Sequence, residues 1–267
     1  MFNLAISPCP NDTFMFYKFI VDHQNYFRIH FSDIEELNEG LLSQKFDISK
    51  CSVALYPFIA EHYALLPTGM AMGFGTGPLL IAKNPNFSIT EETRIGIPGK
   101  YTTAYALLRR YFPQVKHIQE FLFSSIPDEI LKNTIDAGVI IHETRFTYEQ
   151  KKLVKLEDLG SLWEQETKLP LPLGAIVIRR DLITSHAKRW SEELAKSILY
   201  AWSHMDEVLD FCRLHATEIE EQVLRQHIEL YVNDFSLEPG EEGKKAVEYL
   251  ISSVKKEAVS LSNIWAL

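Results

Sequence analysis

Four short polar segments of this chain contain the residue types that proton transfer and anion binding require. Each segment directly follows an apolar run that predicts a buried strand. The segments are residues 7–12, 50–52, 99–103 and 142–145. Histidine exchanges a proton near neutral pH, and ammonium, hydroxyl and backbone N–H groups bind carboxylates. These residue types predict a site in which a base acts on a small anion.

His142 is the candidate base, because it ends the apolar run 137–141. That position predicts a partly desolvated imidazole with a pKa near neutrality, which suits general base catalysis. A structural or surface histidine is the alternative. Glu143 and Arg145 either orient the ring and bind an anion, or pair with each other. Position 146 is Phe146, so the zincin sequence HExxH is excluded.

The segment 99–103 predicts a tight turn that leads into a helix beginning at Thr102 and Thr103. Free N–H groups, the helix dipole and two hydroxyls at such a helix start can trap an anion. A plain N-cap would use the same threonines. The segment is not a P-loop, because GxxxxGK[ST] does not occur.

Lys50, Cys51 and Ser52 end another predicted strand. We expect Lys50 to offset a ligand carboxylate and Ser52 to donate to it, with capping of the next helix as the alternative for Ser52. Cys51 is expected to be a small residue of the core. Segment 7–12 contains two prolines, and it predicts either a rigid ligand-binding loop that includes Asn11 or a helix entry turn.

The order of strands and helices predicts how these segments meet. Strands alternate with helices, and the alternation restarts near residue 94, which predicts an α/β fold with two lobes and mixed, mostly parallel sheets. We assign residues 1–93 and 176–267 to a larger lobe and residues 94–175 to a smaller one. The last predicted helices span roughly residues 186–212, 217–231 and 240–258. Ligands of open α/β sheets bind at the carboxyl ends of strands, so a cleft between the lobes would bring the four segments together.

Composition excludes several classes of function. The 267 residues are 46% hydrophobic and 24% charged, and the net charge of −9 disfavours a nucleic-acid surface. Three distant cysteines, with no CxxC and no zinc spacing, favour a reduced cytoplasmic protein without a metal. Cys9 is disfavoured as a nucleophile, because the sequence shows no basic partner for it. The sequence shows no leader and no long apolar run, so we expect no membrane partner. The sequence does not decide whether the protein forms a homodimer.

Five sequence blocks together resemble the 1,4-dihydroxy-6-naphthoate synthases of the futalosine route of menaquinone biosynthesis. The likeness runs from residue 4 to about residue 250, in the same order and spacing. The blocks are Ser7–Phe14, Pro98–Tyr105, Ile140–Tyr148, Leu169–Ala175 and Tyr231–Asn233.

The resemblance implies a fold like that of the type 2 periplasmic solute-binding proteins, with no metal or organic cofactor. It implies conversion of cyclic dehypoxanthinyl futalosine, a small anion, into 1,4-dihydroxy-6-naphthoate with release of dihydroxyacetone. The family's base maps onto His142, and its substrate contacts map onto Lys50–Ser52 and Thr102–Thr103. Two alternatives stay open: a binding protein for small anions, which would need an export signal, and the sibling chorismate dehydratase, against which the block around His142 argues.

Overall fold

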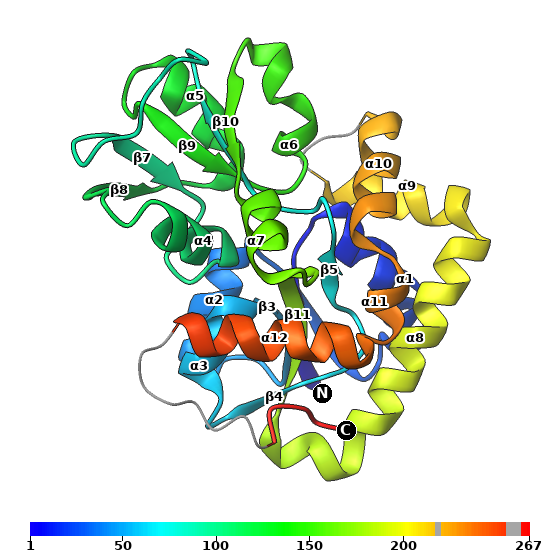
Figure 1. Cartoon of the computed structure of the whole chain (residues 1–267). Helices are drawn as coiled ribbons and strands as arrows, with labels where there is room; N and C mark the ends of the chain where they lie inside the picture. The colour runs from blue at the N-terminus through cyan, green and yellow to red at the C-terminus, as the bar shows by residue number, and fades with distance from the viewer. Residues whose placement is uncertain (217–219, 255–262) are drawn as a thin grey trace.

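Two lobes, each built around one β-sheet, make up the molecule (Figure 1). The computed structural model describes residues 1–216, 220–254 and 263–267. The first sheet has the order β2-β1-β3-β11-β4, and β5 also pairs with β11. Its strands are β1 (Phe2–Ile6), β2 (Phe27–Phe31), β3 (Ile48–Ser52), β4 (Tyr63–Leu65), β5 (Ala71–Gly73) and β11 (Leu171–Arg179).

The second sheet forms the smaller lobe and has the order β10-β6-β9-β7-β8. Its strands are β6 (Leu79–Ala82), β7 (Arg94–Ile97), β8 (His117–Glu120), β9 (Ala137–Ile140) and β10 (Val154–Asp158). Both sheets are mixed, which confirms the predicted fold class. Antiparallel pairing is more frequent than the alternation of strands and helices suggested, because β11 and β6 run antiparallel to their neighbours.

The predicted division into lobes needs one correction. Residues 79–93 were assigned to the larger lobe, but β6 pairs with β9 and β10 in the second sheet. The chain therefore crosses between the sheets after β5 rather than at the predicted boundary between residues 93 and 94. The glycine-rich segment 73–77 makes this first crossing, and α7 with the start of β11 makes the second. β11 returns to the first sheet, as predicted for residues 175–178.

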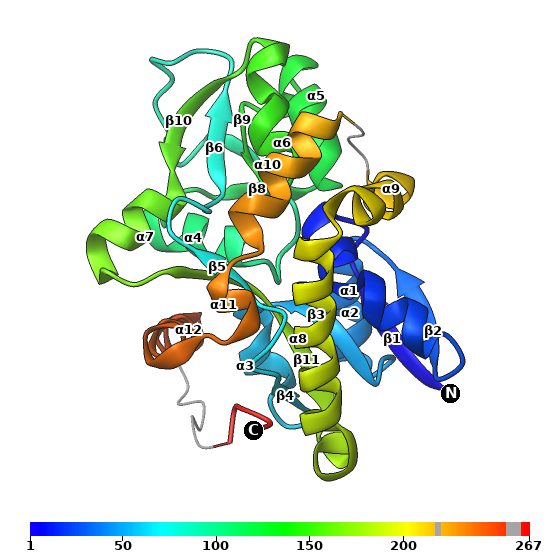
Figure 2. The ribbon, with the colours of Figure 1, turned by 90° about the vertical axis from the view of Figure 1, so that its right-hand side faces the viewer.

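Helices cover both sheets, and the C-terminal helices extend along the two lobes (Figure 2). Before β11 they are α1 (Pro10–His23), α2 (Ile34–Leu42), α3 (Tyr56–Ile59), α4 (Thr103–Tyr111), α5 (Ile126–Leu131), α6 (Thr144–Thr147) and α7 (Leu159–Thr167). After β11 they are α8 (Lys188–Ser203), α9 (Met205–His215), α10 (Glu221–Tyr231), α11 (Asp234–Leu237) and α12 (Gly240–Val254). None of the helices in the described residues is long and apolar enough to cross a membrane.

The predicted C-terminal helices are correct in kind but not in their bounds. The predicted helix 186–212 is divided into α8 and α9 at His204, whose ψ of 43° leaves the helical region. Residues 217–219 and 255–258 of the other two predicted helices lie outside the described residues. The strand β10 and the helix α7 were not predicted, because residues 149–168 show no clear apolar period.

The core of the larger lobe fixes the start of α1, which carries polar residues of the site. Phe14, Met15 and Phe16 are fully buried and belong to the same apolar cluster as Ile198 of α8. Cys9 is the N-cap of this helix, since Pro10 occupies the first helical turn, where its missing N–H is not needed.

Candidate functional site

A pocket lies between the two lobes, and residues from both of them line it. Polar residues that follow β1, β3, β7 and β9 meet there, as the strand-end argument predicted. Six of the predicted site residues line this pocket: Asn11, Lys50, Ser52, Thr102, Thr103 and His142. Cys51 and Arg145 do not line it.

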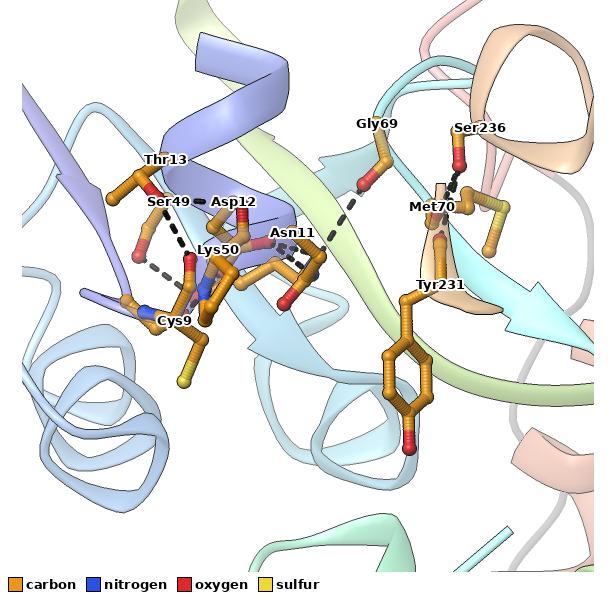
Figure 3. Close-up of polar contacts among 12 residues, drawn as sticks. Cys9, Asn11, Asp12, Thr13, Ser49, Lys50, Gly69, Met70, Tyr231 and Ser236 are labelled. Carbon is orange, nitrogen blue, oxygen red and sulfur yellow. Dashed lines mark hydrogen bonds and ion pairs between the residues drawn. The ribbon is translucent and has the colours of Figure 1, made fainter. Parts of the chain in front are cut away.

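A buried ion pair forms the floor of the pocket on the larger lobe. The Nζ of Lys50 lies 2.7 Å from Oδ1 of Asp12, and the two side chains are 4% and 1% exposed. Lys50 also donates to the carbonyl oxygen of Gly69 (Figure 3). Asp12 accepts a further hydrogen bond from the hydroxyl of Ser7, at 2.7 Å. The charge predicted to offset a ligand carboxylate is therefore already neutralised by Asp12.

Gly174 makes room for this ion pair. A Cβ atom built on Gly174 would lie 2.7 Å from Cε and 3.5 Å from Nζ of Lys50. Gly174 pairs with Ser52 across the β3–β11 ladder, so the lysine side chain passes over it without a clash. The glycine after the Leu-Pro-Leu-Pro-Leu segment is thus required by close packing.

Asn11 connects the ion pair to a second histidine. Its Nδ2 donates to Asp12 at 2.9 Å, and its Oδ1 lies 2.9 Å from Nε2 of His227 on α10. Because that oxygen only accepts, Nε2 of His227 carries the proton. Burial, reinforced by His142 and Lys50, lowers the pKa of His227 well below its ordinary value. His227 is therefore neutral and holds Asn11 in place.

His142 faces the pocket from the end of β9. Its backbone adopts a left-handed conformation (φ = 54°), which turns the chain sharply after the strand. The ring packs edge-on against Phe123 at 4.9 Å and lies nearly parallel to His227 at 6.2 Å between ring centroids. Its Nε2 is buried and has no hydrogen-bond partner among the described residues.

The surroundings of His142 change the pKa that the sequence suggested. Burial lowers it to about 4, with a further lowering by Lys50 and an opposing effect of Asp12. The pKa of His142 therefore lies below the value near neutrality that the sequence suggested, because the ring is desolvated and its Nε2 has no hydrogen-bond partner among the described residues. His142 is neutral at pH 7, and its free nitrogen can accept a proton.

The two threonines at the start of α4 mainly organise the helix. The hydroxyl of Thr102 accepts from the N–H of Tyr105 at 3.2 Å and donates to the carbonyl oxygen of Gly99 at 2.7 Å. Thr102 is thus the N-cap that the alternative interpretation described. The Thr103 hydroxyl donates to the carbonyl oxygen of Leu173 at 3.0 Å, which ties α4 to β11. The groups left to bind an anion at this end are the backbone N–H groups of Thr103 and Ala104.

Ser52 keeps a hydroxyl proton available for a ligand. Its Oγ accepts from Nδ2 of Asn38 at 3.1 Å, and its N–H donates to Oδ1 of Asn38 at 3.0 Å. Its side chain makes no capping hydrogen bond to the following helix, so the capping interpretation is wrong. Asn38 is fully buried and orients Ser52 toward the pocket.

Cys51 and Arg145 have other roles. Cys51 is fully buried, packs in the apolar core, and pairs with Ala175 in the β3–β11 ladder. Arg145 donates to the carbonyl oxygens of Gly75 and Gly77, and so stabilises the first crossing between the lobes. Its Nη2 also lies 3.9 Å from the carboxylate of Asp158. The prediction that Arg145 binds an anion of the substrate gains no support from these contacts.

Sequence reasoning missed Asp12, Asn38, His227 and Tyr231 as parts of the site. Asp12 belongs to segment 7–12, which the sequence analysis selected. Its role was missed because the sequence does not show that this loop is buried. Asn38 and His227 lie on helices whose apolar faces gave no sign of a buried polar residue. Tyr231 lines the pocket and donates to the carbonyl oxygen of Thr76 at 3.2 Å. Only the block Tyr231–Asn233, which the family resemblance included, pointed to this part of the chain.

Sequence comparisons with known proteins agree with one another. A family model described as menaquinone biosynthesis matches residues 2–256. A 1,4-dihydroxy-6-naphthoate synthase of Thermus thermophilus is 39% identical over 96% of this chain and 95% of its own. One of Streptomyces coelicolor is 35% identical over 96% of this chain and 93% of its own.

Two solved structures have folds similar to that of this chain. A protein from Archaeoglobus fulgidus superposes with a TM-score of 0.88 at 29% identity and covers 94% of this chain and 96% of its own. A Candida albicans protein, described as having the generic periplasmic binding protein fold, superposes with a TM-score of 0.66. That pair is 14% identical and covers 99% of this chain and 93% of the other, so it shows the fold alone.

Proposed function

Because the chain belongs to the menaquinone-biosynthesis family of the 1,4-dihydroxy-6-naphthoate synthases, we propose that it converts cyclic dehypoxanthinyl futalosine into 1,4-dihydroxy-6-naphthoate. Dihydroxyacetone is the second product. The reaction needs a base, an anchor for the substrate carboxylate and a site from which water is excluded. The pocket between the lobes offers groups suited to each requirement.

His142 is the proposed general base, and one observation carries this assignment. Its ring lines the pocket, while its Nε2 is buried without a hydrogen-bond partner among the described residues. An imidazole kept neutral by its surroundings is ready to accept a proton. A bound carboxylate would place negative charge near the ring and raise the pKa of His142 from its low value. Binding of the substrate would thus strengthen the base that attacks it.

The proposed anchor for the carboxylate is the N-terminus of α4 together with Ser52. The N–H groups of Thr103 and Ala104 at the start of α4 have no partner within the helix, and the helix dipole favours a negative charge there. Thr103 and Ala104 of this turn line the pocket. Ser52 lies on the other lobe and can donate its hydroxyl proton to the same ligand. An anion held between the two would draw the lobes together and exclude water.

The proposed reaction begins when His142 removes a proton from the sugar-derived ring. The electron pair of the broken C–H bond forms a double bond as the neighbouring C–O bond of the ring breaks, and the departing oxygen is protonated to a hydroxyl. A retro-aldol-like step then breaks a C–C bond and releases the three-carbon fragment, which takes the proton back. Formation of the aromatic dihydroxynaphthalene makes the sequence favourable. General base catalysis contributes about 10²–10⁴-fold, and positioning and electrostatics supply the remainder.

Incubation of the purified protein with candidate substrates tests this function. We expect cyclic dehypoxanthinyl futalosine to give 1,4-dihydroxy-6-naphthoate and dihydroxyacetone in equal amounts, measured by chromatography and mass spectrometry. Chorismate serves as the control and should remain unchanged. Loss of water from chorismate, with no naphthoate formed from the cyclic compound, would identify a chorismate dehydratase instead. Tight binding without turnover of either compound would identify a binding protein.

A further inference from the structure

A cluster of three potential metal ligands lies beside the proposed base. Cys9 contributes a thiol, His142 a ring nitrogen and Glu143 a carboxylate oxygen, and these atoms all lie within 4.8 Å of one another. Cys9 comes from the larger lobe, whereas the other two follow β9 in the smaller lobe. No local zinc spacing revealed the cluster in the sequence, because the fold brings its members together from two lobes. Only His142 of the three lines the pocket.

Cys9 and Glu143 are buried, whereas His142 is partly exposed, and the surroundings of the cluster are acidic. Cys9 and Glu143 are 2% and 3% exposed. Burial raises the pKa of the Cys9 thiol well above its usual value, and the carboxylates of Glu143, Asp12 and Asp33 raise it further, while a hydrogen bond with Ser7 opposes this shift. The same negative charges favour a divalent cation beside the thiol. Figure 3 shows the Cys9 sulfur pointing away from the hydrogen bond between its own carbonyl oxygen and Thr13, so that bond does not hold the sulfur in place.

The donor set is one that zinc prefers. Zinc binds thiolate, imidazole and carboxylate ligands at about 2.0–2.3 Å, and three protein ligands leave a fourth position for water. Ligand atoms around a tetrahedral zinc are therefore about 3–4 Å apart. A separation of at most 4.8 Å requires the cluster to contract by about 1 Å, so metal binding would have to rotate the Cys9 or Glu143 side chain.

We propose that Cys9, His142 and Glu143 bind a zinc-class divalent cation and that the bound cation inhibits the enzyme. A neutral imidazole has one nitrogen with a free electron pair, and the other nitrogen carries the proton. Coordination through either nitrogen uses the electron pair that would accept the substrate proton. The inhibition rests on the proposed role of His142 as the base, whereas the metal binding does not.

Cobalt is the probe for the site, because a thiolate bound to Co²⁺ gives a charge-transfer band that reports directly on the cysteine ligand. We expect the full chain to develop this band up to one equivalent of Co²⁺ and to lose it when Zn²⁺ is added. Cys9→Ala should abolish the band and weaken zinc binding, measured by equilibrium dialysis, at least about 100-fold. Cys212→Ala is the matched control, since Cys212 is also buried but lies outside the cluster, and it should keep the band. Absence of the band in the native chain, or its persistence in Cys9→Ala, would overturn the site.

An activity measurement tests the inhibition separately. Stoichiometric Zn²⁺ should stop turnover of the native enzyme, and Cys9→Ala should stay active at the same zinc concentration. If cobalt binds through Cys9 but zinc leaves turnover unchanged, the inhibition is wrong and the metal site stands. Full turnover by His142→Ala without any metal would instead refute the proposed base.

Discussion

The buried pair of Asp12 and Lys50 gives the most quantitative prediction for stability. Its charged atoms are 2.7 Å apart, and both side chains are almost completely buried. Replacement of Lys50 by methionine leaves the Asp12 carboxylate with only the hydrogen bonds from Ser7 and Asn11. Removal of one partner of such a pair costs about 3–5 kcal/mol, because a buried charge is left uncompensated. Lys50→Met should therefore lower the free energy of unfolding by about that amount.

The double variant distinguishes this explanation from simple loss of packing. Asp12→Asn with Lys50→Met contains no unpaired charge, and the amide oxygen that replaces the carboxylate still accepts the hydrogen bond from Ser7. We expect the double variant to be more stable than Lys50→Met alone, with a coupling free energy of about 2–3 kcal/mol. Urea unfolding followed by circular dichroism measures all four proteins of the cycle.

An exposed pair on the same helix provides the control. Lys18 and Asp22 of α1 also form an ion pair, but their side chains are 33% and 44% exposed. Lys18→Met should cost no more than about 1 kcal/mol, because solvent screens exposed charges. Equal losses in Lys18→Met and Lys50→Met, or additive effects in the double variant, would refute the argument from burial.

Three further predictions concern the pocket. Thr103→Ala removes the hydrogen bond to Leu173 and should raise KM about 2- to 10-fold with little change in kcat. Thr103→Ser keeps the hydroxyl and should keep the native KM. Equal KM values in the two variants would contradict the anchoring role of α4. Since burial lowers the pKa of His142 to about 4, its base form is lost only as the pH falls through that value. The kcat/KM of the native enzyme should therefore stay constant from about pH 8 to about pH 5 and decrease below, and a decrease centred near pH 6.5 would show a solvated ring. Gly174→Ala should displace Lys50 and lower the free energy of unfolding, and native stability of this variant would show that the lysine has room to move.

Much of the site was predictable, because strand ends can be recognised from the sequence. The apolar runs before Lys50, Thr102 and His142 placed all three residues at one cleft, and the structure brings them there. The roles of individual side chains were less predictable. Lys50 is neutralised because the buried carboxylate of Asp12 lies beside it. Thr102 caps α4 because its hydroxyl accepts a hydrogen bond from the N–H of Tyr105. Such contacts depend on distances between segments far apart in the chain.

The predicted boundary of the smaller lobe was wrong for a related reason. The apolar run at β6 predicts a strand correctly but contains no information about which sheet that strand joins. The same limit applies to the Cys9 cluster, since the sequence shows no basic partner near Cys9 while the fold supplies His142. The pKa of His142 also depends on its burial beside Lys50, which residue types alone do not specify.

The turnover of His142→Ala tests the central claim most directly. His23→Ala is the control, because His23 is a buried histidine that lies at the far end of α1, outside the pocket. With cyclic dehypoxanthinyl futalosine as substrate, His142→Ala should lose at least about 100-fold in kcat, while its circular dichroism spectrum and its affinity for the substrate stay native. His23→Ala should keep its turnover. A folded His142→Ala protein that forms 1,4-dihydroxy-6-naphthoate at the native rate would contradict the assignment of this imidazole as the base.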